Sequence, residues 1–431
     1  MNLVATRWSG PSASALTRED LAYLIGTCVL AVTRISEHSK YSTNSSGFDC
    51  SGGQPGQHSV GSDRTTGESD DVMLFTLDEA PRTVPASTTA AILAGAAALQ
   101  VVLGGMRFVD GSMLLQFSQV GFQAQLQDSS QYLFDSPLKI VLLRLLHLDS
   151  ATAIGLLFIA LNFLPLAAIW LVARQQQERL ALLAIVTIMP IWKVMFQNIG
   201  VGDSVVIACT IVLVMARCWP CVGITTFAMV LWHFQQGMLI CLILSVLCIA
   251  AQEPERRPRI MSILLGAAAA TIVFSILKVY FMPSYTDRLG VNLAHMGPSL
   301  RQNLLFFPIG ICAIVPGTLL IIEAMQRGGR RARPALGWMT LGAIGLAICV
   351  GAIIIDFSRV TLLLTFPIVL FLANPRAMPS GFFEKLLTPR AVVPVLAVAV
   401  MTPMLAWSGI EVYLWPTVLV TFQKYFGAMP W

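Results

Sequence analysis

The 431 residues of this chain are 56% apolar and only 12% charged, and their mean hydropathy is +0.72. Soluble domains are about 45–50% apolar and about 25% charged, so the composition excludes a soluble enzyme, a nucleic-acid binder of the usual basic type and a disordered protein. The net charge of +5 is small for this length. It has to be explained by where the charges lie along the chain and does not indicate an acidic partner.

The N-terminal segment, residues 1–87, differs in composition from the rest of the chain. Residues 37–71 are rich in Ser, Gly, Thr and Asp and have almost no apolar side chains, which is typical of disorder. The apolar run 21–35 is shorter than the about 20 residues that a transmembrane helix needs. We therefore expect residues 1–87 to be poorly ordered. Met73 precedes the first strong apolar run, and we hypothesise that it is the natural start of the protein.

Apolar runs recur through residues 88–431, where charges, prolines and glycines bound them. A helix needs about 20 predominantly apolar residues to cross a bilayer, so these runs are candidate spans. They lie near 88–105, 151–172, 180–196, 203–217, 220–232, 237–251, 260–282, 303–324, 337–355, 359–373 and 391–408. The sequence predicts an all-α polytopic membrane protein with about 11 transmembrane helices.

The lysines and arginines of the short loops define the expected orientation. Thirteen Lys or Arg and only four Asp or Glu lie in the loops 173–179, 217–220, 252–259, 325–336 and 374–390, which would share one side. Because cytoplasmic loops are enriched in Lys and Arg, we place this side in the cytoplasm. The N-terminus is then cytoplasmic and the C-terminus external. We expect an integral protein of the bacterial inner (cytoplasmic) membrane with its active face in the periplasm.

The first outer loop, residues 106–150, contains two amphipathic stretches. Asp110 lies near its start, and apolar residues follow at near-helical spacing, at Leu114, Leu115, Phe117, Val120, Phe122 and Leu126. Residues 138–148 repeat the pattern around Lys139, Arg144 and His147. Both stretches predict helices that lie on the membrane surface. The polar face of the first carries Gln and Ser instead of charges, which suits the floor of a pocket for a lipid-linked substrate.

Further polar residues lie in tight connections between the expected spans, all of them on the outer side. They are Asn198 and Asp203 after the third span, His233 and Gln235 after the fifth, Arg288 and His295 after the seventh, and Asp356 and Arg359 after the ninth. An ionisable side chain near hydrocarbon is costly unless it is paired. Each of these residues is therefore a candidate functional residue.

Several of these candidates also have a structural interpretation. Asp203 follows two glycines and fits a helix N-cap, and His233 beside Trp232 fits an interfacial anchor. Asp356 and Arg359 are three residues apart and fit an ion pair at a helix start. Arg359 also fits a phosphate ligand, because guanidinium donors can engage two oxygens at once.

Cys218 and Cys221 form a CxxC pair, a pattern found in redox and zinc sites. Neither a second ligand pair nor a βαβ pattern accompanies it. The other cysteines beyond residue 200 lie in or beside apolar runs, where a thiol behaves as a small hydrophobe. The sequence therefore favours a structural role for these cysteines.

The order of features after residue 88 resembles the integral-membrane glycosyltransferases of the GT-C superfamily: one span, then a long outer loop with an acidic residue near its start and amphipathic helices after it. The resemblance covers residues 88–431 and lies in topology more than in motif. It implies that an acidic residue of the first outer loop is the general base on an acceptor hydroxyl. That role would fall on Asp110, with Asp128 or Asp135 as substitutes. Some members have paired acids where this chain has one, so no metal or other cofactor is indicated.

The resemblance implies a transferase that moves a sugar from a polyprenyl-phosphate donor, with inversion, in cell-envelope glycan or glycolipid synthesis. Its partners would be the lipid-linked donor, membrane lipid and a glycan or lipid acceptor, and not nucleic acid. Asp110 would take the acceptor proton, and Arg359, helped by Arg288 or His233, would neutralise the departing phosphate. The remaining substrate-binding candidates are Asp128, Asp135, Asn198, Asp203, Gln235, His295 and Asp356.

Three other classes of protein stay open. A transporter or flippase for a lipid-linked or amphipathic solute would suit mid-span breakers, which occur at Pro165, Pro190, Pro316 and Pro367. The spans carry almost no charge at mid-depth, which weakens coupled transport. A polysaccharide polymerase or ligase usually has its large outer loop late in the chain, whereas here the large loop is first. A structural subunit of a membrane assembly is the non-enzymatic alternative.

Overall fold

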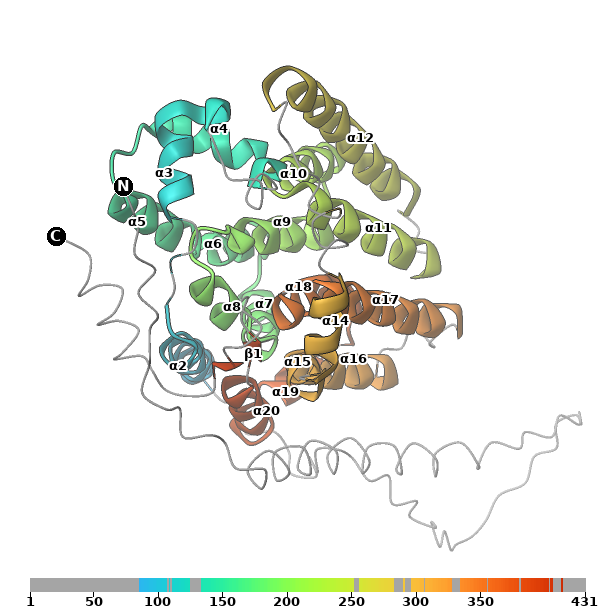
Figure 1. The fold of residues 1–431 in the computed structure, drawn as a ribbon. Helices are drawn as coiled ribbons and strands as arrows, with labels where there is room; N and C mark the ends of the chain where they lie inside the picture. Colours follow the sequence, from blue (N-terminus) through green and yellow to red (C-terminus); the bar gives the residue numbers. More distant parts are fainter. Residues whose placement is uncertain are drawn as a thin grey trace, which may run out of the picture. The chain divides into compact units, whose positions relative to one another are not determined.

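Helices make up nearly all of the regular structure in the computed structural model of the chain (Figure 1). The structure describes residues 85–106, 108, 111–124, 133–251, 256–282, 290, 296–305, 307–327, 334–354, 356–379, 381–402, 404–405 and 412–413. All of them belong to one of the two units into which the chain divides, Pro81–Trp431. The expectations for Met73 and for nearly all of residues 1–87 concern segments outside the described residues.

Among the described residues, the first half of this unit is helical, and several of its helices coincide with expected runs. Its elements are α2 (Ala86–Gly104), α3 (Gly111–Val120), the 3-10 turn η1 (Gly121–Gln123), α4 (Pro137–Leu146), α5 (Ala151–Leu161), α6 (Leu164–Val172), α7 (Gln176–Ile188), α8 (Ile191–Gln197), α9 (Asp203–Met215), α10 (Trp219–Trp232) and α11 (Phe234–Ala251). The expected single span 180–196 is interrupted, because Pro190 lies between α7 and α8 and a proline cannot continue the hydrogen-bond ladder.

The second half continues with long helices and ends in a short hairpin. Its elements are α12 (Arg256–Phe281), α14 (Met296–Leu305), α15 (Phe307–Cys312), α16 (Val315–Arg327), α17 (Pro334–Ile353), α18 (Phe357–Leu372), α19 (Phe382–Leu386), α20 (Pro389–Met401) and the antiparallel strands β1 (Met404–Leu405) and β2 (Val412–Tyr413). The expected run 303–324 is divided among three helices, and Pro316 stands at the start of the last of them.

Five helical segments in the described part of the chain are long and apolar enough to cross a membrane: Ala86–Gly104, Ala151–Val172, Phe234–Ala251, Arg257–Phe281 and Ala335–Ile353. The pair α7 and α8 would make a sixth span, bent by 61° at its break. Shorter apolar helices of 10–17 residues coincide with other expected spans. The all-α architecture and the indication of an integral membrane protein are thus confirmed, whereas the count of eleven spans stays a prediction.

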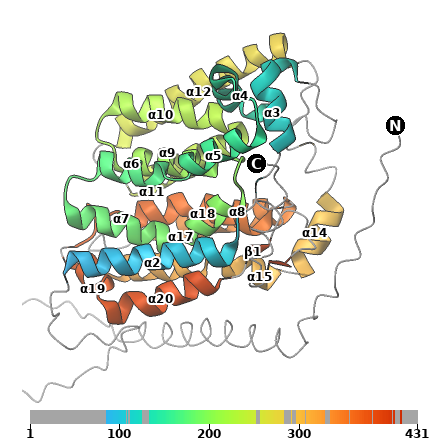
Figure 2. The same cartoon turned by 90° about the vertical axis from the view of Figure 1, so that its left-hand side faces the viewer.

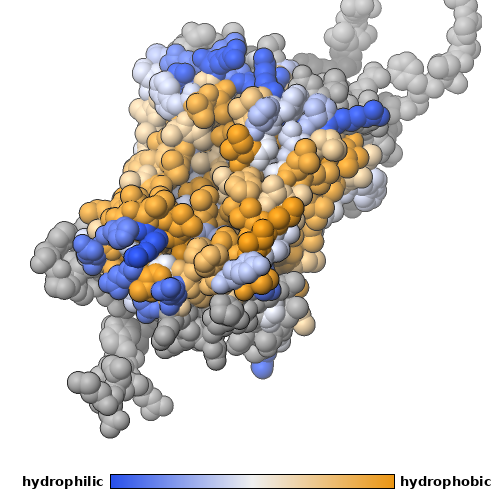
Figure 3. Space-filling view, turned by 90° about the horizontal axis from the view of Figure 1, so that it is seen from above, coloured by the Kyte–Doolittle hydropathy of each residue, from blue (hydrophilic) through white to orange (hydrophobic). Residues whose placement is uncertain are grey.

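The surface and the interior divide as they would in a lipid solvent. Figure 3 shows one face on which apolar side chains cover a broad area and hydrophilic side chains gather toward its ends. Large apolar side chains lie exposed on α12 and α17, among them Leu265, Val279 and Trp338. Exposed apolar surface on this scale needs a cover, and a bilayer supplies it. In contrast, α18 is buried along nearly its whole length.

The helices α9, α11 and α18 pack together in the interior (Figure 2). Because α18 is surrounded by other helices, polar side chains at its start are held inside protein and not in lipid. The first turn of α18 is therefore the place where an ionisable group needs a partner from a neighbouring helix.

The two helices expected in the first outer loop form as α3 and α4, and they pack against each other. Leu114 and Phe117 of α3 are buried, and the Phe117 ring meets Phe134 edge-on at 5.4 Å between centroids. Ser118 Oγ donates to the carbonyl oxygen of Leu148 at 2.9 Å. Part of the apolar stripe thus stabilises this pair of helices. Their place on a membrane surface stays a prediction.

Candidate functional site

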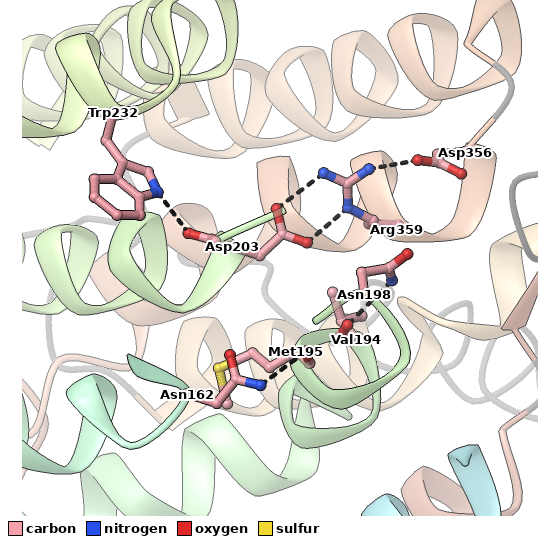
Figure 4. A network of polar contacts seen from close by, with 9 residues as sticks. Asn162, Val194, Met195, Asn198, Asp203, Trp232, Asp356 and Arg359 are labelled. Carbon is pink, nitrogen blue, oxygen red and sulfur yellow. Dashed lines mark hydrogen bonds and ion pairs between the residues drawn. The ribbon is translucent and has the colours of Figure 1, made fainter. Parts of the chain in front are cut away.

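Arg359 in the first turn of α18 joins two carboxylates inside the protein (Figure 4). Its Nε donates to Asp203 Oδ2 at 2.6 Å and its Nη2 donates to Asp203 Oδ1 at 2.9 Å. Its Nη1 donates to Asp356 Oδ2. Arg359 is only 4% exposed and Asp203 only 1%. Asp203 begins α9, so this contact ties the starts of α9 and α18 together.

The charges of these three residues do not cancel. One guanidinium faces two carboxylates, so the group carries one net negative charge if both acids are ionised. A buried charge is costly unless it is paired and hydrogen-bonded, and here each partner satisfies that condition. The expectation that Arg359 binds phosphate needs revision in one respect: its donors are already directed at Asp203 and Asp356. A phosphate would have to displace a carboxylate.

The turn before α9 explains why Asp203 points to Arg359. Gly200 and Gly202 both adopt a positive φ, of 102° and 84°, a conformation that favours glycine. Trp232 Nε1 donates to the carbonyl oxygen of Gly202 at 2.9 Å. Gly202 is the N-cap residue of α9 and no side chain caps this end. Asp203 therefore does not serve as the N-cap, and its carboxylate is left to pair with Arg359.

His233 and Asp135 connect the same region to the first outer loop. His233 Nδ1 lies 3.5 Å from Asp135 Oδ2, and both side chains are buried. Ser136 Oγ donates to Asp135 Oδ1 at 2.8 Å. His233 follows Trp232 directly, at the junction of α10 and α11. His233 is thus packed inside the protein, whereas an interfacial anchor would be exposed to the membrane surface.

We call the resulting set the buried polar network: Asp135, His233, Trp232, Gly202, Asp203, Arg359 and Asp356. It runs from the start of α4, through the α10–α11 junction, to the starts of α9 and α18. These segments are far apart in sequence, and Arg359 is separated from Asp203 by 156 positions. The network lies at the end of the helices that the sequence places on the outer side.

The start of the first outer loop is anchored beside this network. Phe108 forms an isolated parallel bridge with Ile199, in the turn between α8 and α9. Gln197 Nε2 donates to the carbonyl oxygen of Gly104 at 2.7 Å. Asp110 itself lies outside the described residues, as do Asp128, Arg288 and His295. The described residue Phe108, two positions before Asp110, is thus held against the turn that leads to Asp203.

Asn198 and Gln235 are two further expected ligands that the structure describes. Asn198 Nδ2 donates to the carbonyl oxygen of Val194 at 3.1 Å, one turn back in the chain. Gln235 is half-buried at the start of α11. Its neighbour Gln236 is buried instead, and no hydrogen-bond partner for its Nε2 occurs among the described residues.

Buried polar residues outside the predicted set of site residues occur at the same end. Ser204 Oγ and Gln236 Nε2 are buried and unpartnered within the described part of the chain. Lys139 of α4 is buried as well. Lys193 of α8 donates from Nζ to the carbonyl oxygens of Val400 and Thr402, at 3.0 and 2.7 Å. The sequence could have indicated Lys193, because a lysine within an apolar run stands out. No comparable pattern in the sequence distinguishes Ser204 and Gln236 from other polar residues.

The described ranges contain no group of three His, Cys, Asp or Glu side chains that could hold a metal ion. Comparisons with protein-family models, with curated proteins and with solved structures find no match for this chain. The class of protein that the fold defines is therefore an all-helical chain with five or six candidate membrane spans. Its function has to be argued from the buried polar network and its surroundings.

Proposed function

We propose that this protein is a membrane glycosyltransferase that moves a sugar from a polyprenyl-phosphate donor to an acceptor hydroxyl at the outer face of the membrane. The observation that supports it most is the buried polar network, which links the first outer loop to three apolar helices at one end of the helical array. Polar groups with this degree of burial suit a site that excludes bulk water next to lipid. The product would be a cell-envelope glycan or glycolipid.

The reaction needs a base near the acceptor hydroxyl, and we assign that role to Asp110. A carboxylate takes the hydroxyl proton as the oxygen attacks the anomeric carbon, and the sugar–phosphate bond breaks on the opposite face. A single displacement of this kind inverts the anomeric configuration. The bridge between Phe108 and Ile199 supports the assignment, because it holds a residue two positions from Asp110 beside the start of α9.

The departing phosphate needs a cation whose charge is not already cancelled. Arg359 is paired with two carboxylates, so we assign it a positioning role in which it holds Asp203 and Asp356. Lys193 lies at the same end, and its described partners are two carbonyl oxygens. Carbonyl groups carry no formal charge that would neutralise an ammonium, which suits stabilisation of phosphate oxygens. Arg288 and His233 remain further candidates for this role.

Sugar hydroxyls need donors and acceptors that the protein itself leaves unused. Ser204 Oγ and Gln236 Nε2 fit this need, since both are buried without a described partner. A buried polar group without a hydrogen bond costs about 1–3 kcal/mol, and a bound ligand would recover that cost. Asn198, Gln235 and the other outer-loop candidates would complete the site.

Sugar transfer can be tested with the purified full-length protein in proteoliposomes. The proteoliposomes contain polyprenyl-phosphate sugars whose sugar moiety is radiolabelled. The proposal predicts release of polyprenyl phosphate and labelling of an acceptor lipid or glycan, with inverted configuration at the anomeric carbon. Empty liposomes and heat-inactivated protein serve as controls. If a panel of hexose and pentose donors is neither consumed nor bound by the protein, a glycosyltransferase is the wrong class.

One observation favours a flippase for a lipid-linked or amphipathic solute as the second candidate. The bend of 61° between α7 and α8 is a broken helix, a feature found where transporters bind their substrates. A flippase would move a fluorescent lipid-linked sugar between leaflets without breaking its sugar–phosphate bond. The same proteoliposomes separate the two functions, because only the transferase releases polyprenyl phosphate.

A further inference from the structure

A second polar region lies at the opposite end of α9 from the buried polar network. Asp203 is the first residue of α9 and Met215 is the last, so the two ends are about 18 Å apart at about 1.5 Å per residue. The carbonyl oxygen of Met215 accepts a hydrogen bond from Arg376 Nη1 at 2.5 Å. Arg376 Nη2 also donates to the carbonyl oxygen of Val172, the last residue of α6, at 2.6 Å. Arg376 therefore joins the ends of two helices.

A cavity of about 290 Å³ opens beside Arg376. Its walls come from the first half of α7, from Arg217 just after α9, and from the segment between α18 and α19 together with the start of α19. The polar groups among them are Gln175, Gln177, Glu178, Arg217 and Arg376. Ligand pockets typically measure about 300–1,000 Å³, so this one suits a small headgroup and not a whole lipid.

Two arginines and one acid line the cavity, so its lining carries one net positive charge. Glu178 is engaged on both carboxylate oxygens, since Oε1 accepts from Arg376 Nε at 3.0 Å and Oε2 accepts from the backbone N–H of Arg174 at 3.1 Å. Arg376 is half-buried and its donors are directed at Glu178 and at the helix ends. Arg217 is exposed and forms no salt bridge among the described residues, although its positive charge helps to lower the pKa of Glu178 from a longer distance. Its guanidinium is the group that would attract an anion into the cavity.

Nearby aromatic and apolar side chains place the cavity at the depth of a membrane surface. Trp170 at the end of α6 is 64% exposed, and the Arg179 guanidinium lies 3.9 Å from the centre of its ring. Leu171 beside it is exposed too. Tryptophan is typical of the level of the lipid headgroups, and long arginine side chains near helix ends extend to the same level. A phosphate group carried by a membrane lipid would meet Arg217 at this level.

We propose that this cavity binds a phosphate ester through Arg217, with the phosphate of an anionic membrane lipid as its source. Guanidinium donors match phosphate oxygens in pairs. The amide of Gln175 lines the same cavity, as does that of Gln177, which also donates to Glu384 Oε1 at 3.0 Å. The site lies at the end of the helices that we expect in the cytoplasm. It is independent of the proposed sugar transfer, because no group of the buried polar network takes part in it.

The test uses the full-length protein in neutral detergent, titrated with short-chain phosphatidylglycerol, with phosphatidylcholine or with inorganic phosphate. The readout is the lipid concentration that gives half of the maximal rise in melting temperature. We expect phosphatidylglycerol to stabilise the wild type more than phosphatidylcholine does. Arg217→Gln should weaken its binding about tenfold, the effect of losing one charge-assisted hydrogen bond. Arg217→Lys should retain part of the binding, since it keeps the charge.

Arg257→Gln is the matched control, because Arg257 is exposed on the same expected side but does not line the cavity. Equal losses in Arg217→Gln and Arg257→Gln would mean that only the general surface charge attracts lipid, and the site would be rejected. Equal stabilisation by phosphatidylcholine would reject it too. If inorganic phosphate alone stabilises the wild type but not Arg217→Gln, the phosphate site stands and its source is a soluble phosphate.

Discussion

The Arg359 guanidinium binds the Asp203 carboxylate through two parallel hydrogen bonds, of 2.6 and 2.9 Å, although 156 positions separate the residues in sequence. This pair fixes the first turn of α18 against the first residue of α9. It also connects, through Gly202 and Trp232, to the junction where His233 faces Asp135. A substitution of Arg359 should therefore lower the stability of the fold more than it changes substrate binding.

Arg359→Ala should lower the free energy of unfolding by about 3–5 kcal/mol, because it leaves buried carboxylates without a partner. Arg359→Lys should recover part of this loss, since an ammonium carries the charge but cannot form two parallel bonds to Asp203. Denaturant and thermal unfolding in detergent measure both effects. Arg257→Ala, at an exposed arginine, should stay within about 0.5 kcal/mol of the wild type. A loss at Arg359 no larger than that of the control would contradict a structural role for this pair.

Gly202→Ala should destabilise the protein by at least about 1–2 kcal/mol, the cost of placing a side chain in a left-handed conformation. A Cβ atom at Gly202, where φ is +84°, would also lie 2.6 Å from Trp232 Nε1. The matched control is Gly95→Ala within α2, where a Cβ would meet nothing within 4 Å. There the substitution should leave stability unchanged or raise it, because alanine suits a helix better. Melting temperatures of the two variants should move in different directions or by clearly different amounts.

Gln236→Leu should leave the free energy of unfolding unchanged or raise it, because the buried Nε2 has no described partner to lose. Gln100→Leu provides the contrast. Gln100 Nε2 donates to the carbonyl oxygen of Thr187 at 2.6 Å, so its loss should cost about 1 kcal/mol. If Gln236 binds a sugar hydroxyl, Gln236→Leu should raise KM for the sugar donor while the fold stays intact. An unchanged KM together with unchanged stability would remove Gln236 from the site.

The orientation can be tested at Cys218, which is exposed just before α10. A hydrogen bond from the Cys221 thiol lowers the pKa of Cys218, so its thiolate, the form that reacts with maleimide, should be populated at a lower pH than in an ordinary cysteine. With the cysteines other than Cys218 and Cys221 replaced, a membrane-impermeant maleimide should label Cys218 in inside-out vesicles and not in intact cells. Asp149→Cys, at an exposed position of the first outer loop, should show the reverse. Labelling of both from the same side would contradict the expected topology.

The sequence predicted the helices well because each depends on local composition. Runs of apolar residues long enough to cross a bilayer stand out without knowledge of their neighbours, and α2, α11, α12 and α17 follow them closely. The kink at Pro190 was visible for the same reason. The number of spans could not be predicted in the same way, since α9, α10, α16, α18 and α20 are shorter than the about 20 residues that a helix needs to cross a bilayer.

The partners of the polar residues could not be predicted, because they come from elements distant in sequence. Asp356 and Arg359 are neighbours on one helix start, so their ion pair was a visible alternative. That Asp203 takes the rest of the guanidinium depends on the packing of α9 against α18. The sequence predicted Gln235 as a ligand, whereas Gln236 is the more buried of the two side chains. Periodicity could not distinguish them, because in an apolar helix it does not tell which face contacts protein and which contacts lipid.

The most direct test of the central proposal compares Asp110→Asn with Asp149→Asn in the sugar-transfer assay. Both acids lie in the first outer loop, and Asp149 is exposed. Loss of a general base typically costs about 10²–10⁴-fold in rate. We predict that Asp110→Asn lowers kcat by at least about a hundredfold while donor binding and melting temperature stay unchanged, and that Asp149→Asn keeps wild-type activity. Full activity in Asp110→Asn would contradict the account.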